Sequence, residues 1–135
     1  MVKLVTIFLC LSISSFALKA ETEAQKKLES CIADSELTTA AMTNCANNAS
    51  EDWDKELNQV YRELMKKLNP KAKEELRLSQ LKWLKHRDKE LEFIDAMYYD
   101  ERFQGTMYSN TRAAHRFSVV KERVLVLRAY LNLFN

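Results

Sequence analysis

The sequence contains one glycine and one proline among its 135 residues, Gly105 and Pro70. Tight turns rely on these two residue types, so their scarcity argues against an all-β fold. A glycine-rich phosphate-binding loop is excluded for the same reason. The hydrophobic content of 47% is enough for a core, but 135 residues are too few for two ordinary domains. We therefore predict an all-α fold: a single bundle of about four helices with long central and C-terminal helices.

Acidic residues are missing from the first twenty positions. This segment has a basic start at Lys3, an apolar run over residues 4–16, and a small residue, Ala20, at its end. This pattern is typical of a secretory signal peptide, and the apolar run is too short for a comfortable membrane span. We predict a signal peptide over residues 1–20 and a helical domain over residues 21–135. The mature protein is then periplasmic or secreted, without stable membrane insertion.

A strong net charge is also missing once the signal peptide is removed. Without Lys3 and Lys19, 19 basic side chains remain against 19 acidic ones. The first half of the mature chain, residues 21–70, carries a charge of −4, and residues 71–135 carry +4. This balance gives no strong argument for a nucleic-acid partner or an anionic membrane surface, and we expect no nucleic acid to bind.

Cysteine is scarce as well, and one of the three, Cys10, lies in the signal peptide. Cys31 and Cys45 remain in a chain that is predicted to be exported, where a disulfide is the expected state. Closing this loop stabilises the fold by roughly 3 kcal/mol on a chain-entropy estimate. The alternative, a metal site, needs further ligands at fixed spacing, and the only histidines are His86 and His115. We expect no metal and no cofactor.

Helical periodicity and capping residues divide the mature chain. A first helix is predicted over residues 21–33, with Ser35 as the cap of a second helix that starts near Leu37. The second helix is expected to bend or restart at residues 47–50, where helix propensity is low. Its apolar stripe then resumes with Trp53, Leu57, Val60, Tyr61, Leu64 and Leu68. Asn69 is predicted to cap a third helix that has Pro70 at its first position.

The third helix, over residues 70–99, is predicted to be the centre of the bundle. Its apolar stripe consists of Leu76, Trp83, Leu84, Leu91, Ile94 and Tyr98. A last helix is expected from about Met107 or Ser109 to Leu133, after a connection marked by Gly105. Its apolar arc covers about half of the circumference, which indicates contact with two neighbouring helices or with another chain.

Two arginines, Arg87 and Arg123, fall inside these apolar surfaces. A buried guanidinium group without an acceptor is unfavourable by several kcal/mol, so both need partners. We predict that Asp88 accepts a hydrogen bond from Arg123 across the interface between the third and fourth helices. The full predicted network is structural rather than ligand-binding and consists of Asn58, Tyr61, Gln80, Trp83, Arg87, Asp88 and Arg123.

These residues also carry a family resemblance. In order and spacing, the chain resembles the LprI-type lysozyme-inhibitor N-terminal domain family through Cys31, Met42-Thr43-Asn44-Cys45, Asp54-x-Glu56-Leu57-Asn58-x-x-Tyr61, Gln80-x-x-Trp83, Arg87-Asp88, Gly105 and Arg123. The resemblance implies an exported, all-helical, disulfide-containing domain, in a family named for a lipoprotein that inhibits lysozyme. Family members commonly carry a second cysteine pair, and Leu91 and His115 occupy those positions here.

The resemblance and the residues together predict a protein-binding module of the cell envelope rather than an enzyme. A catalytic histidine needs a nucleophile and an orienting carboxylate within reach, and the sequence shows no recognisable partner of either kind for His86 or His115. Lysozyme, the partner that the resemblance implies, is strongly basic, so we expect an acidic binding patch formed by Glu51, Asp52, Asp54 and Glu56. The alternative is a structural or self-associating envelope protein that binds another envelope protein, or a second copy of itself through the C-terminal helix.

Overall fold

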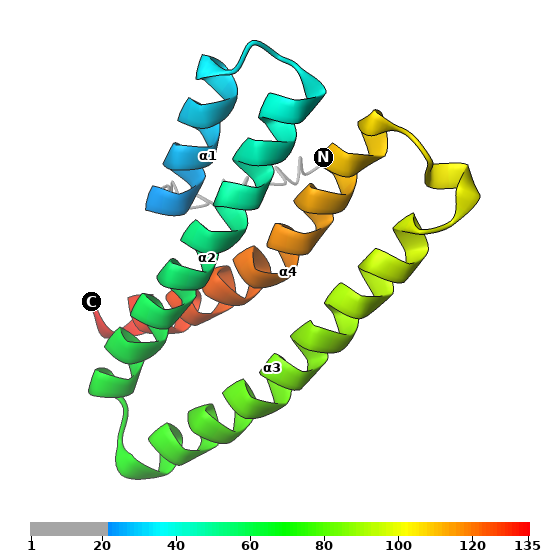
Figure 1. Cartoon of the computed structure of the whole chain (residues 1–135). Helices are drawn as coiled ribbons and strands as arrows, with labels where there is room; N and C mark the ends of the chain where they lie inside the picture. Colours follow the sequence, from blue (N-terminus) through cyan, green and yellow to red (C-terminus); the bar gives the residue numbers. More distant parts are fainter. Residues whose placement is uncertain (1–21) are drawn as a thin grey trace, which may run out of the picture.

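Four α-helices make up most of the computed structural model, which describes residues 22–135 (Figure 1). They are α1 (Glu23–Asp34), α2 (Thr39–Lys67), α3 (Pro70–Tyr98) and α4 (Thr106–Leu131), and short 3₁₀ turns, η1 (Glu101–Phe103) and η2 (Asn132–Phe134), flank α4. No strand is present within residues 22–135. The all-α prediction is therefore confirmed, while the predicted signal peptide lies outside the described residues.

Side-chain caps explain where three of the helices begin. The side-chain oxygens of Thr22, Thr38 and Asn69 accept hydrogen bonds from backbone N–H groups in the first turns of α1, α2 and α3. The prediction for Asn69 and Pro70 is confirmed. The prediction for Ser35 is wrong, because Ser35 ends α1 by donating to the carbonyl oxygen of Ile32 at 2.8 Å, and Thr38 caps α2 instead.

Helix α2 continues without interruption through residues 47–50, so the expected bend or restart is absent. Ala49 lies in this stretch and is 2% exposed within the main apolar core. Packing of small residues against a neighbouring helix outweighs the low helix propensity of the two asparagines beside it, since propensity is only a weak contribution.

The core lies between α2 and α4, with α1 packed over one side of this pair. Trp53 and Leu64 of α2 and Val124 and Leu127 of α4 are the largest fully buried side chains. Leu28 of α1 belongs to the same cluster. The disulfide between Cys31 and Cys45 joins α1 to α2 with the two Cα atoms 5.7 Å apart, as predicted.

Helix α3 is an outer arm of the fold and not its centre, which corrects the prediction from sequence. Ile94 is its only buried residue, and the other members of the predicted stripe are half-buried. Figure 1 shows α3 standing apart from α2 along most of its length, and its main contact is with α4. A single helix face can show the right periodicity and still be only partly covered, because periodicity does not fix how much of a neighbour lies against it.

Candidate functional site

Two guanidinium groups lie close to the ring of Trp83 in α3. The Cζ atom of Arg87 is 5.7 Å from the Trp83 ring centroid, and the Cζ atom of Arg123 from α4 is 5.8 Å from it. Both distances are within the range of cation–π attraction. The three residues form a cluster that fastens α3 to α4, and we call it the Arg–Trp–Arg cluster.

Arg123 donates hydrogen bonds to two neutral acceptors on α3. Its Nε donates to the side-chain oxygen of Gln80 at 3.0 Å, and its Nη2 donates to the Ser79 hydroxyl at 3.3 Å. Burial lowers the pKa of the Arg123 guanidinium, and the nearby Tyr130 opposes this shift. The predicted hydrogen bond from Arg123 to Asp88 is absent. Asp88 is exposed and accepts instead from Arg87 at 2.7 Å, and Arg87 also faces Asp54 of α2.

Arg87 links α3 to α2 more loosely. Its Nη1 lies 3.8 Å from a carboxylate oxygen of Asp54, whose other oxygen accepts from the amide of Asn58 at 3.3 Å. Asn58 is exposed and contacts its own helix, so it does not complete the predicted network around Arg123. Tyr61 is half-buried against the core.

Several of these predicted residues line a cleft of about 330 Å³ between α2 and α3. Its walls are formed by Asp54, Leu57, Asn58, Tyr61, Arg77, Gln80, Leu81, Leu84 and Arg87. The structure therefore brings the motif residues of the two helices to one place, but around an open space rather than in a packed interface.

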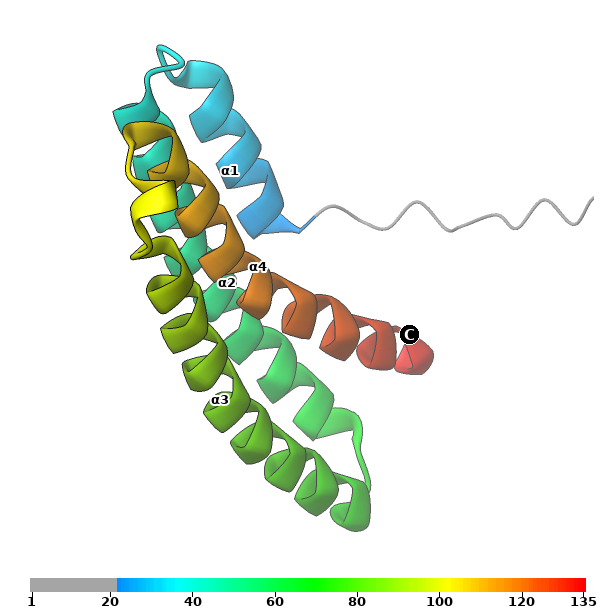
Figure 2. The ribbon, with the colours of Figure 1, turned by 90° about the vertical axis from the view of Figure 1, so that its right-hand side faces the viewer.

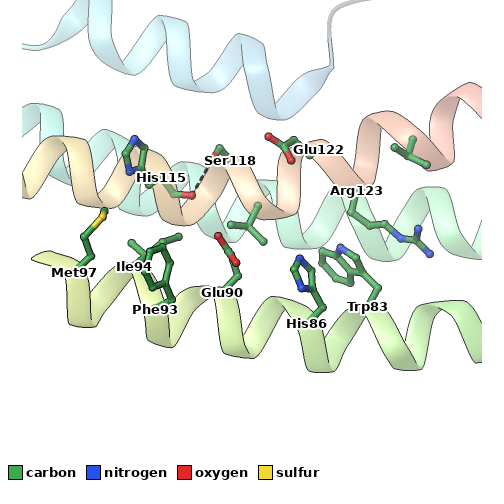
Figure 3. Close-up of a pocket in the computed structure, with 12 residues that line it drawn as sticks. Trp83, His86, Glu90, Phe93, Ile94, Met97, His115, Ser118, Glu122 and Arg123 are labelled. Atoms are coloured by element: carbon green, nitrogen blue, oxygen red, sulfur yellow. Dashed lines mark hydrogen bonds between the residues drawn. The ribbon is translucent and has the colours of Figure 1, made fainter.

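A larger groove of about 630 Å³ runs between α3 and α4. Figure 3 shows Phe93 and Ile94 projecting from α3 toward α4, with Trp83 and Arg123 near one end of the groove. Both histidines line it. His115 Nδ1 lies 3.1 Å from the Tyr98 hydroxyl, and Ser118 donates to the backbone carbonyl of His115 rather than to its ring. This geometry contains no activated serine nucleophile among the groove residues.

The predicted acidic patch is largely neutralised within the fold. Asp52 pairs with Lys27 at 3.3 Å and with Lys55 at 3.6 Å, and Asp54 faces Arg87. Glu56 is 6% exposed, so it is not part of any surface patch. Of the four residues of the predicted patch, only Glu51 is exposed and forms no salt bridge with another described residue.

Glu56 has instead a structural role that the sequence reading missed. Its carboxylate accepts from the backbone N–H of Ala24 at 3.1 Å and pairs with Arg128 of α4. The helical spacing in the sequence does indicate this burial, because Glu56 lies three residues after Trp53 and four before Val60 and so shares their buried face. A second missed contact joins Asp95 of α3 to Arg112 and Arg116 of α4.

The positions of the second cysteine pair hold side chains with separate surroundings. His115 contacts Tyr98 in the groove between α3 and α4. Leu91 lines a different hollow together with Arg116 and Val120. The α3–α4 interface is therefore held by the Arg–Trp–Arg cluster and the Asp95 pairs rather than by a disulfide at these positions.

Neither a metal-binding cluster nor a membrane-spanning helix is found among residues 22–135. No group of three or more His, Cys, Asp or Glu side chains is arranged to hold a metal ion. None of the helices combines the length and the apolar character that crossing a bilayer requires.

The fold and its site define a small, disulfide-linked helical domain with surface clefts. The sequence pattern of the family described as "Lysozyme inhibitor LprI" matches residues 31–127. The chain therefore belongs to the LprI lysozyme inhibitor family. No curated protein and no solved structure matches the chain significantly.

Proposed function

We propose that this protein is an exported, protein-binding domain that inhibits lysozyme. The observation that carries this proposal is the family match over residues 31–127, which spans the disulfide, the Arg–Trp–Arg cluster and most of the core. An inhibitor acts by binding another protein and needs a rigid surface rather than catalytic groups. The disulfide and the buried α2–α4 core supply rigidity to the surface they support.

A lysis assay tests this function. The purified exported chain is titrated into a basic c-type lysozyme acting on cell walls and, separately, on a soluble chitooligosaccharide. Inhibition of both reactions is expected, with saturation at a stoichiometric ratio. The soluble substrate is the control, because a protein that only coats the cell wall would not inhibit the reaction on it. Unchanged lysozyme activity at a large molar excess would rule the proposal out.

The second candidate function is self-association through α4. The C-terminal part of α4 exposes Val126 and Tyr130, and the η2 turn that follows it exposes Leu133 and Phe134. Apolar surface of this kind marks an interaction site when it is contiguous. Sedimentation equilibrium separates the two candidates: a mass that doubles with concentration and returns to the monomer in Tyr130→Lys supports self-association, and a constant monomer mass removes it.

A further inference from the structure

Two chain connections lie at the same end of the molecule. Residues 34–38 join α1 to α2, and residues 99–107 run from the end of α3 into the start of α4; Figure 2 shows both at one end of the bundle. The N-terminal parts of α2 and α4 are in contact there, since the hydroxyls of Thr43 and Ser109 are 3.0 Å apart. We call residues 34–38 and 99–107 the loop end.

The loop end exposes large apolar side chains. Leu37 is 72% exposed, Tyr99 is 87% exposed and Met107 is 66% exposed. Elsewhere in the described chain, only Phe93, Tyr130 and Leu133 of the large apolar side chains are more than half exposed. Tyrosine and methionine are enriched at protein interfaces, and several such side chains at one end indicate a docking surface more strongly than one would alone.

The same surface is acidic. Its charged residues are Asp34, Glu36, Asp100, Glu101 and Arg102, which give a net charge of −3. Arg102 pairs with Asp100 at 2.9 Å, while Glu36 and Glu101 form no salt bridge within the described chain. These carboxylates are thus available to a basic partner, in contrast to Asp52, Asp54 and Glu56.

The opposite end of the molecule has the opposite charge. Residues 62–77, where α2 ends and α3 begins, carry six basic side chains against three acidic ones. We call this region the basic end. A strongly basic partner is repelled from the basic end and attracted to the loop end, so the charge distribution favours one docking orientation.

The backbone of the α1–α2 connection is fixed in an unusual conformation. Leu37 has a φ of +54°, in the left-handed region that a branched side chain rarely adopts, and its N–H donates to the Ser35 hydroxyl at 3.3 Å. The Cys31–Cys45 disulfide joins the helices on either side. A connection held in this way presents Leu37 to solvent with little conformational entropy left to lose on binding.

From these observations we infer that the loop end is the surface that docks a strongly basic protein of the lysozyme type. This inference rests on the proposed function and adds the site to it. Leu37, Tyr99 and Met107 supply the apolar contacts, and Glu36 and Glu101 supply the charge complementarity at their rim.

Matched charge reversals test the inference. Glu36→Lys/Glu101→Lys changes the loop end, and Glu63→Lys/Glu75→Lys makes the same change in net charge at exposed sites of the basic end. Binding of a basic c-type lysozyme to the exported chain is measured by calorimetry at physiological salt. We expect affinity to fall by about tenfold or more in the first variant and by no more than about twofold in the second. Tyr99→Ala/Met107→Ala should weaken binding by roughly tenfold without changing the charge.

The outcomes separate the two proposals. Binding by the wild type that is lost only in the loop-end variants supports both. Binding that survives both loop-end variants, or that falls equally in the basic-end variant, overturns the docking surface and leaves the proposed function standing. A wild-type chain that does not bind lysozyme overturns both. Circular dichroism spectra and melting curves of all variants establish that the helices remain folded.

Discussion

At the scale of single residues, Glu56 is the point where three helices meet. It lies in α2, accepts a hydrogen bond from the first turn of α1, and pairs with Arg128 of α4. A carboxylate near a helix N-terminus is also favoured by the helix dipole. Arg128 is only partly exposed, and its Nε has no hydrogen-bond partner in the described structure. Removing Glu56 therefore leaves a poorly solvated cation and an unpaired N–H group behind.

We expect Glu56→Ala to lower the free energy of unfolding by about 3 kcal/mol, because one partner of a largely buried pair is lost. Glu63→Ala, at an exposed position of the same helix, is the matched control and should change it by no more than about 0.5 kcal/mol. Urea unfolding measures both values. Equal losses in the two variants would mean that Glu56 is solvated and does not join the helices.

Arg123 gives a second prediction at this scale. Since Arg123 contacts Gln80 and not Asp88, Arg123→Ala should destabilise the fold by about 1–2 kcal/mol through the loss of a cation–π contact with Trp83 and of a hydrogen bond. Asp88→Ala should change stability by less than about 1 kcal/mol, as expected for an exposed ion pair. A double-mutant cycle should give a coupling of about 1 kcal/mol for Arg123 with Gln80 and close to zero for Arg123 with Asp88. A large coupling with Asp88 would contradict the observed geometry.

At the scale of elements, α1 is attached mainly from its two ends. The disulfide holds its C-terminal turn, Glu56 holds its N-terminal turn, and only Ala24 and Leu28 of its 12 residues are buried. Its stability therefore depends on these attachments more than on packing. Of the buried residues in the α2–α4 core cluster, only Cys45 belongs to the disulfide loop, so this core should tolerate the loss of the bond.

Replacing both cysteines, Cys31→Ser/Cys45→Ser, should lower the free energy of unfolding by roughly 3 kcal/mol. Amide hydrogen exchange should become faster in α1 first, while α4 near Val124 stays protected until global unfolding. An unchanged melting temperature would show that the disulfide contributes nothing. Uniformly faster exchange at native-state conditions would contradict the independence of α1.

Helices α3 and α4 are joined by a pH-dependent contact. Burial raises the pKa of Asp95, but hydrogen bonds from Arg116 and Arg112 outweigh this effect and hold the pKa below its ordinary value. A carboxyl group with a lowered folded-state pKa stabilises the fold above its unfolded-state pKa, and this stabilisation disappears as the pH falls through the folded-state value.

Asp95→Asn should therefore be less stable than the wild type at pH 7, and the difference should shrink as the pH falls below the ordinary aspartate pKa and through the lowered folded-state pKa of Asp95. Urea unfolding at pH 7 and at pH 3 measures this change. Glu92→Gln, at an exposed position one turn away, is the control. A difference that persists unchanged at pH 3 would show that the ion pairs are not its source.

Local sequence signals predicted the elements better than their arrangement. Asn69 followed by Pro70 defines a helix start within a few residues, and two cysteines in a chain that is predicted to be exported indicate a disulfide, so both features could be predicted without the fold. The position of α3 could not be predicted from the sequence, because an apolar stripe indicates a buried face whether one neighbouring helix covers it or two. The partner of Arg123 depended on that position. Glu56 was misread as a surface residue because its sequence neighbours are acidic, although its helical neighbours are apolar.

At the scale of the whole molecule, the fold places different charge and chemistry at its two ends. The loop end combines exposed apolar side chains with unneutralised carboxylates, and the basic end carries the excess of lysine and arginine. The disulfide and Glu56 hold α1 in place, so the α1–α2 connection is presented on a fixed support. We propose that this member of the lysozyme inhibitor family uses the loop end to bind lysozyme.

Amide hydrogen exchange of residues 21–135, with and without a saturating basic c-type lysozyme, is the direct test of this proposal. Slower exchange on complex formation should be concentrated in residues 34–38 and 99–107, with little change in residues 62–77 at the basic end. Protection confined to the groove between α3 and α4, to the C-terminal part of α4, or to the basic end would contradict the claim.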